Sequence, residues 1–534
     1  MFDTLIVGGT IVDGTGNPRY KADVGITNGK ITAIGSLSGS QSKRTIDATQ
    51  HVVSPGFIDM HTHSDVTLVD DPCGESKAYQ GVTTEVTGNC SYSPFPSGIG
   101  GAAALKESLG QTLVSKVDWK WSSLDEWAED LETEGISVNV APQVGNAALR
   151  VAAGAKQDGE ATNDQLGIMK KLAVESVEQG AFSLSTGLSL APSGYATTHE
   201  IIELCKAISG YEGVFYVTHA RVGPGRHISM IEEAVEIGQK GGVPVQFSHM
   251  AITDWRHYGE GPEMISVIEK AREESLDMTY DMYPYIAAGA GLDQTIPLWA
   301  QAGTLNEYMD RLRDPQTRQR ILEGVAEGIG HLSPKWDTWV VSLAKTDSNK
   351  RLVGMSIKEI AEDRGVAPEE AVLQLTEEEG GVVPVTVYNR KEDDIRYFMG
   401  HPLAMIGSDG SAVSPEGLHG DAMPHPRYYG TYPRILGRYV REKPSVLSLE
   451  SAIHKMTGFP SERLIMKERG LIKENYIADV VIFDPDTIID CATFEDPHQY
   501  PKGIPHVIVN GQSVIQNGKH TGSRPGKVLR RGET

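Results

Sequence analysis

The sequence has few cysteines, no long hydrophobic run and fewer basic than acidic residues. Four cysteines in 534 residues cannot build a disulfide scaffold, which leaves room for a thiol kept for its chemistry. No apolar run approaches the ~18 residues that a membrane span needs. The first nine residues lack the basic and apolar regions of a signal peptide. We therefore expect a cytoplasmic protein with reduced cysteines, and no membrane partner.

The charge balance narrows the possible partners. The chain carries 49 basic against 71 acidic residues, a formal net charge of -22. Such a surface repels a phosphate backbone, so we expect no nucleic-acid partner. With 39% hydrophobic residues and 58 glycines, the composition excludes a disordered or collagen-like chain and provides for a large core.

The two ends of the chain are rich in short β segments. Hairpin signals stand at Asn28-Gly29 near the start and at Asn510-Gly511 near the end. Because both ends share this pattern, we expect residues 1–53 and 472–534 to form one small β-sandwich domain.

The middle of the chain, residues 54–471, alternates short apolar runs with helical stretches. Eight candidate strands fit a (β/α)8 TIM barrel of the α/β class. They are Gly56–Met60, Thr83–Thr87, Val138–Pro142, Ala181–Ser185, Val214–Thr218, Val243–Ser248, Asp277–Tyr283 and Ala404–Gly407. The interval before the last strand is too long for one βα unit and predicts an inserted helical segment around 286–400. The Gly100–Trp121 region is expected to be a loop insertion before a helix that starts near Ser122.

Two histidines end the first candidate strand. His61 and His63 are two residues apart, so their side chains project from the same side of the strand. A His-X-His pair can occur by chance on a surface, but directly after an apolar strand it favours a metal site.

Two later strands also end in histidine, at His219 and His249. Either one alone is more often a packed residue with a satisfied ring nitrogen. Each stands where barrel active sites assemble, at the C-terminal end of a strand, so they join His61 and His63 in a candidate cluster. The other twelve histidines, His199, His227 and His257 among them, are interpreted as surface or loop residues.

Asp409 and Cys90 complete the candidate site. Asp409 follows the last candidate strand, in Ser408-Asp409-Gly410. A lone Asp before Gly is usually a turn residue. At the end of an eighth barrel strand that faces the histidines, it is instead a candidate metal ligand or general base. Cys90 follows the second strand and is either a small buried hydrophobe or a zinc ligand. Cys73, Cys205 and Cys491 are interpreted as structural.

Taken together, these residues resemble the amidohydrolase superfamily and, within it, the D-aminoacylase (N-acyl-D-amino-acid deacylase) family. The resemblance covers nearly the whole chain. It is carried by Ser54–Asp65, Gly88-Asn89-Cys90, Asn139–Gly145, Gly180–Leu188, the two histidine strands, Asp281–Tyr285, Gly407–Gly410, His425–Arg434 and Ala478–Pro485.

The resemblance implies a zinc enzyme that hydrolyses a linear N-acyl amide, most simply an N-acyl-D-amino acid. One zinc would be held tightly by Cys90, His219 and His249, with His61 and His63 forming a second, weaker position. Asp409 would act as the catalytic carboxylate and a metal ligand. Hydantoinases bridge their metals with a carboxylated lysine on the fourth strand, but Gly180–Gly187 contains no lysine, so Cys90 would bridge instead.

The resemblance also implies that Tyr283 and Arg427 bind the substrate carboxylate. Arg427 suits a bidentate pair with a carboxylate, although a surface arginine and a packed tyrosine are the simpler interpretation of the two residues. The chain departs from the family around the substrate: Ala251 replaces a lysine, Leu190-Ala191-Pro192 replaces Tyr-Pro-Pro, and the loop from Ser411 to Met423 is long.

Three hypotheses follow. The first is the deacylase, which acts on a small-molecule amide and for which a homo-oligomer is one open option. The second is an amidohydrolase of the same fold that acts on another amide, a carbamate or a dipeptide-like substrate. The third is a non-catalytic metal-binding scaffold, which the presence of every candidate ligand and of Asp409 disfavours.

Overall fold

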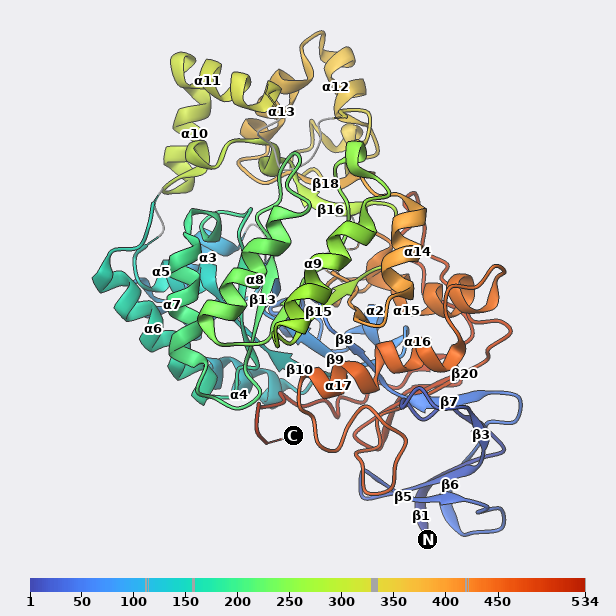
Figure 1. The fold of residues 1–534 in the computed structure, drawn as a ribbon. Helices are drawn as coiled ribbons and strands as arrows, with labels where there is room; N and C mark the ends of the chain where they lie inside the picture. Colours follow the sequence, from blue (N-terminus) through green and yellow to red (C-terminus); the bar gives the residue numbers. More distant parts are fainter. Residues whose placement is uncertain are drawn as a thin grey trace.

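The computed structural model describes residues 1–533 except 111–112, 114, 156–158, 328–334, 418–419 and 421. The N-terminal strands and the C-terminal segments lie together at one end of the molecule, and the helices of residues 305–378 lie at the opposite end (Figure 1). The parallel strands and their helices fill the space between them.

All eight strands expected in the middle of the chain are present, and their ends differ from the predicted ends by no more than two residues. One parallel sheet has the order β10-β9-β8 and the other the order β11-β12-β13-β14-β15-β19. Their bounds are β8 Phe57–Asp59, β9 Val82–Thr87, β10 Asn139–Pro142, β11 Val144–Gly145, β12 Ser183–Gly187, β13 Phe215–His219, β14 Val245–Phe247, β15 Met278–Met282 and β19 Ala404–Ile406. A parallel bridge between Thr62 and Gly410 joins the segments that follow β8 and β19. The C-terminal ends of strands from both sheets are thereby brought together.

Amphipathic helices follow these strands and cover them. In α8, Met230, Ile231, Ala234 and Ile237 are buried, the spacing of one helical face. The helix α6 begins at a capping box made by Thr162 and Gln165. The flanking helices are α5 Asn146–Ala152, α6 Asn163–Glu178, α7 Thr198–Ile208, α8 Ser229–Gly241, α9 Gly261–Glu273, α14 Glu392–Gly400, α16 Leu449–Met456 and α17 Gly458–Arg463.

Both ends of the chain contribute to one seven-stranded sheet of order β23-β22-β21-β20-β7-β2-β3. Within it β7 (Val52–Pro55) pairs antiparallel with β20 (Val480–Phe483). The other strands of this sheet are β2 Thr10–Ile11, β3 Tyr20–Lys21, β21 His506–Val509, β22 Gln512–Gln516 and β23 Lys519–His520. A second sheet has the order β5-β4-β1-β6 and consists of β1 Phe2–Val7, β4 Asp23–Thr27, β5 Lys30–Gly35 and β6 Ser42–Asp47. Isoleucines and valines from both sheets share one buried cluster.

The segment between β15 and β19 has its own hydrophobic core. Its helices include α10 Leu305–Arg313, α11 Pro315–Ala326, α12 Ile357–Arg364 and α13 Pro368–Glu378, and α14 follows at its C-terminal end. They accompany an antiparallel sheet of β16 (Ala288–Gly291), β18 (Pro384–Val387) and β17 (Trp339–Val341), which the helical prediction did not include. The segment therefore packs as a unit on its own.

The stretch predicted as a loop at Gly100–Trp121 contains the helix α3 (Gly101–Leu109), so that prediction is wrong over these residues. Leu105 and Leu109 are buried, four residues apart, and give the helix its apolar side. The next helix, α4 (Leu124–Glu134), begins where expected because the Ser123 side chain accepts a hydrogen bond from the Glu126 amide. Across the described residues, none of the helices has the length and apolarity to cross a bilayer.

Candidate metal centre and active site

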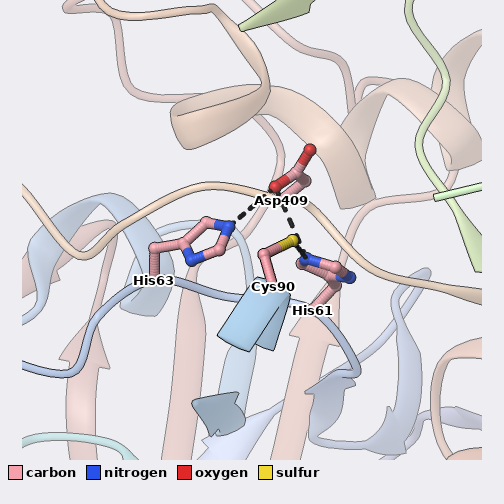
Figure 2. Close-up of side chains that lie close together, drawn as sticks. All are labelled: His61, His63, Cys90 and Asp409. Carbon is pink, nitrogen blue, oxygen red and sulfur yellow. Dashed lines mark hydrogen bonds and ion pairs between the residues drawn. The ribbon is translucent and has the colours of Figure 1, made fainter. Parts of the chain in front are cut away.

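His61 and His63 leave the end of β8 and meet Asp409, which comes from the end of β19 (Figure 2). His63 Nε2 lies 3.0 Å, and His61 Nε2 3.5 Å, from the same Asp409 oxygen, Oδ1. The Cys90 Sγ atom is 3.3 Å from His61 Nε2. One ligand atom from each of these four residues therefore lies around one point.

Cys90 also belongs to a second group, with His219 and His249. Its Sγ atom lies 3.7 Å from His219 Nδ1 and 3.6 Å from His249 Nε2, and the two ring nitrogens are 3.0 Å apart. Cys90 is thus the member that the two groups share. Strands β8, β9, β13, β14 and β19 each contribute at least one of the six residues.

The backbone is strained at three of these positions. Cys90, His249 and Asp409 have φ angles of 51°, 37° and 53°, a region that residues other than glycine rarely adopt. Each of the three directly follows the end of a strand or lies in the turn after it. Strain of this kind, of order 1–3 kcal/mol for each residue, persists where the surrounding structure fixes a side chain for function.

Two buried aspartates orient the ligand groups from behind. Asp281, on β15, lies 3.2 Å from His61 Nδ1 and accepts a hydrogen bond of 2.8 Å from the His249 amide. Asp59, on β8, accepts hydrogen bonds from the amides of His61 and Ser408. Such partners fix the ring orientation and the tautomer of a metal-binding histidine.

Lys77 lies beneath the site and is fully buried, at 0% exposure. Its Nζ donates to Asp59 Oδ2 at 3.0 Å, to Ser408 Oγ at 2.6 Å and to the Gly410 carbonyl at 3.2 Å. Glu85 Oε2, on β9, is 3.8 Å away. The lysine on α2 (Glu75–Ala78) therefore connects β8 with the turn that carries Asp409.

Charges within the cluster set its protonation. Burial acts to raise the pKa of the Cys90 thiol, but His61, His219 and His249 hold that pKa well below its ordinary value. Burial likewise acts against ionisation of Asp409, yet Arg427, His61 and His63 keep its pKa well below the usual range. The site thus favours a thiolate and a carboxylate, the forms that bind metal ions.

A cavity of about 330 Å³ opens onto this cluster and is lined by His63, Cys90, His219, His249 and Asp409, with Tyr283, Arg390 and Arg427. The volume suits a small-molecule ligand. The structure therefore brings every residue predicted for the site to one place, with His61 buried beside them.

The surroundings of Arg427 and Tyr283 are more crowded than the sequence suggested. Arg427 Nη1 is 2.8 Å from Asp409 Oδ2, so the charge of the guanidinium is already paired. Tyr283 is buried, and the guanidinium carbons of Arg390 and Arg427 lie 4.0 Å and 4.6 Å from its ring centroid. Arg427 is therefore not a surface arginine, whereas Tyr283 is packed as the alternative interpretation has it, against the two guanidinium groups.

Sequence reasoning missed Arg390, Lys77 and the supporting role of Asp281. Arg390 follows β18 of the inserted segment and has no local motif that would mark it. Asp281 lies in a quoted block, and its position near the end of a parallel strand was a usable signal. Lys77 has no such signal, because its partners come from three other parts of the chain.

Comparison with known proteins agrees with this geometry. Residues 44–515 match the model of the amidohydrolase family, so the chain belongs to that family and the predicted resemblance is confirmed. It is 34% identical to a D-aminoacylase of Alcaligenes xylosoxydans xylosoxydans, over 99% of this chain and 98% of the relative. An N-acyl-D-aspartate deacylase of the same organism is 32% identical, over 99% and 95% of the two chains. These relatives support the predicted metal-dependent amide hydrolase.

Solved structures agree in the same way. A crystal structure of D-aminoacylase superposes with a TM-score of 0.83 at 33% identity, covering 99% of this chain and 100% of that one. An N-acyl-D-glutamate deacylase from Bordetella bronchiseptica, complexed with zinc and a phosphonate inhibitor, also gives 0.83, at 30% identity and 99% coverage of both chains. A dihydropyrimidinase, 15% identical with a TM-score of 0.54, shares the fold alone.

Proposed function

We propose that the protein is a zinc-dependent amidohydrolase that hydrolyses N-acyl-D-amino acids to a carboxylate and a free amino acid. The observation that carries this proposal is the buried Cys90 shared by two groups of ligand atoms at the floor of a substrate-sized cavity. Deacylases of D-amino acids at 31–34% identity over the whole chain support the substrate class.

The donor set fits zinc. A thiolate and imidazole nitrogens are ligands that zinc prefers, and the atoms within each group lie within 4.8 Å of one another. Cys90, His219 and His249 would hold the tighter ion, and His61 and His63 the second position, with Asp409 beside it. Zinc, when bound, supplies a water that ionises near neutrality and a Lewis acid for the carbonyl oxygen.

Asp409 is the group placed to move protons. Because its pKa is held low, it is ionised at neutral pH and can accept the proton of the attacking water. It then returns that proton to the departing nitrogen, since a neutral amine leaves far more readily than an amide anion. Arg427 holds the second carboxylate oxygen and so fixes the direction in which the first one points.

Arg390 is the better candidate for the substrate carboxylate. Both guanidinium groups have a buried Nε without a hydrogen-bond partner among the described residues, but Arg427 is paired with Asp409, whereas Arg390 stacks on Tyr283 and forms no ion pair within the described part of the chain. A guanidinium in this state suits a bidentate pair with the α-carboxylate of the substrate. Tyr283 and Arg427 complete the wall around it.

The rest of the cavity favours a neutral side chain. Arg390 and Arg427 are the only two arginine or lysine residues that line it in the described part of the chain, so one carboxylate of the substrate accounts for the unpaired charge. Apolar residues line other parts of the wall: Leu113, Leu190, Val222, Met230 and Ala251. We infer a preference for apolar over acidic D-amino acids.

A hydrolysis screen on zinc-loaded enzyme tests this function. The substrates are N-acetyl derivatives of D- and L-leucine, of D-aspartate and D-glutamate, and the carboxamide of N-acetyl-D-leucine, which lacks the free carboxylate. We expect the D-leucine derivative to be hydrolysed fastest, and Arg390→Met to raise its KM at least about tenfold while leaving the carboxamide unaffected. Equal turnover of the carboxamide favours an amidohydrolase of carboxylate-free amides, and no turnover of any substrate favours a scaffold.

We further propose that the two parallel sheets form one closed (β/α)8 barrel over residues 54–471 and that the terminal sheets form a sandwich domain over residues 1–53 and 472–534. The Thr62–Gly410 bridge and the shared cluster of the terminal sheets support this division.

A further inference from the structure

A second cluster of metal-binding side chains lies on the two loops that carry His219 and His249. His227 follows His219 by eight residues, and His257 follows His249 by eight. Each stands in the loop after its strand, β13 or β14, and Glu260 ends the second loop at the start of α9. The sequence alone predicts only that both histidines are surface or loop residues, and both do lie in loops.

The three side chains are in close contact. Glu260 Oε2 lies 2.6 Å from His227 Nε2, and Glu260 Oε1 lies 3.1 Å from His257 Nδ1. The two rings are 4.0 Å apart between centroids, with planes inclined by 31°. One ligand atom from each residue falls within 4.8 Å of the others. Ligand atoms on a tetrahedral zinc with bonds of about 2.0–2.1 Å are about 3.3 Å apart, so small side-chain rotations would bring the three atoms to this spacing.

We propose that His227, His257 and Glu260 form a separate site for a divalent cation of the zinc class. Two imidazoles and one carboxylate are the ligand set of many open zinc sites, in which water takes the fourth position. The Glu260 side chain is 41% exposed and His257 27% exposed, which gives an ion access, while His227 is only 10% exposed.

Two features of the surroundings bear on the proposed site. The buried Nδ1 of His227 has no partner among the described residues. Asp254 Oδ2 lies 4.0 Å from His257 Nε2, but its charge is paired with Arg256, so Glu260 supplies the negative charge of the site. Asp254 is itself held by Arg256 and by the Gly225 amide, so it links the two loops and fixes the approach of the rings.

The proposed site lies between two loops that border the substrate cavity. The ion would join the loop after β13 to the loop after β14, and those loops start at His219 and His249, two candidate ligands of the active-site metal. Val222 and Thr253, on the same loops, line the substrate cavity. Occupancy would therefore stiffen one side of the cavity. The site does not depend on the proposed substrate.

Metal titration tests the proposal. Apo-enzyme is titrated with Zn²⁺, and bound equivalents are counted by mass spectrometry of the metal, for the wild type and for His227→Gln, His257→Gln and Glu260→Gln. We expect each variant to bind one equivalent less than the wild type, or to bind it at least about tenfold more weakly. His199→Gln, an exposed histidine on α7, is the matched control and should leave the count unchanged.

Anomalous diffraction from wild-type crystals soaked in ZnCl₂ gives an independent answer, which does not require any variant to fold. A peak within bonding distance of His227 and His257 supports the site. The absence of such a peak, or identical zinc counts in the wild type and all three variants, overturns the proposal. The three side chains would then form a hydrogen-bonded cluster without a metal ion. Both readouts measure metal, so they remain informative if the enzyme proves inactive on N-acyl-D-amino acids.

Discussion

At the scale of single residues, Asp409 has a partner on each of its carboxylate oxygens. His63 lies against Oδ1 and Arg427 against Oδ2. Asp409→Asn keeps this shape but removes the proton acceptor. We expect the variant to retain its zinc and to lose about 10²- to 10⁴-fold in kcat. Metal analysis and steady-state kinetics on one preparation check this, and full activity would remove Asp409 as the base.

A second prediction concerns Cys90, whose thiolate belongs to both groups of ligand atoms. A serine hydroxyl stays protonated at neutral pH and binds zinc poorly, so Cys90→Ser should lower the zinc content by at least one equivalent. Cys491→Ser, at a partly buried free cysteine away from the ligand groups, is the control. Unchanged zinc in Cys90→Ser would return this residue to the class of small buried hydrophobes.

The ligand cluster could be predicted from sequence because each member directly follows an apolar strand, and parallel strands end at one edge of a sheet. His61, His219 and Asp409 all carry this signal. Arg390 and Lys77 could not be predicted. The first lies in an inserted segment, and the second acts through partners that only the tertiary structure brings near. The pairing of Arg427 with Asp409 also depends on the fold and not on a motif.

At the scale of elements, Lys77 ties α2 to β8, β9 and the turn after β19. Lys77→Met leaves Asp59 and Glu85 buried without their cation, in a region where burial already raises the pKa of Glu85 to about 7. We expect a loss of about 3–5 kcal/mol in the free energy of unfolding, measured by urea denaturation. Adding Asp59→Asn should recover part of the loss.

Lys171→Met, at an exposed position on α6, is the matched control and should change stability by less than about 0.5 kcal/mol. If Lys77→Met behaved like this control, the buried network would not hold these elements together.

The elements themselves differ in how well the sequence predicts them. The parallel strands were found because they are short, apolar and separated by helices, whereas the small sheet of β16, β17 and β18 was missed. Paired residues of this sheet lie up to 99 positions apart along the chain, as Ala288 and Val387 do, and Ala288–Gly291 has no β-branched residue to mark it.

In the terminal sheet, His506 is expected to make the free energy of unfolding depend on pH. Burial, followed by Arg44 and His51, lowers the pKa of His506 to about 4. An unfolded chain takes up this proton near pH 6.5, before the folded chain does, so stability should fall as pH drops from about 6.5 to 4 and level off below, by up to about 2 kcal/mol. Urea midpoints across this range should decline less in His506→Gln than in the wild type. Equal slopes in the two proteins would contradict the assignment.

At the scale of the whole molecule, the formal net charge of -22 opposes an anionic substrate that must reach Arg390 inside the cavity. Between 10 mM and 150 mM salt the screening length falls from about 30 Å to about 8 Å, so the long-range repulsion weakens while the contact with Arg390 inside the cavity persists. We expect kcat/KM for an N-acyl amino acid to rise about two- to fivefold over this range, and that of its neutral carboxamide to stay constant. A decrease for the anionic substrate would show that the local field of Arg390 and Arg427 controls its approach, in spite of the acidic surface.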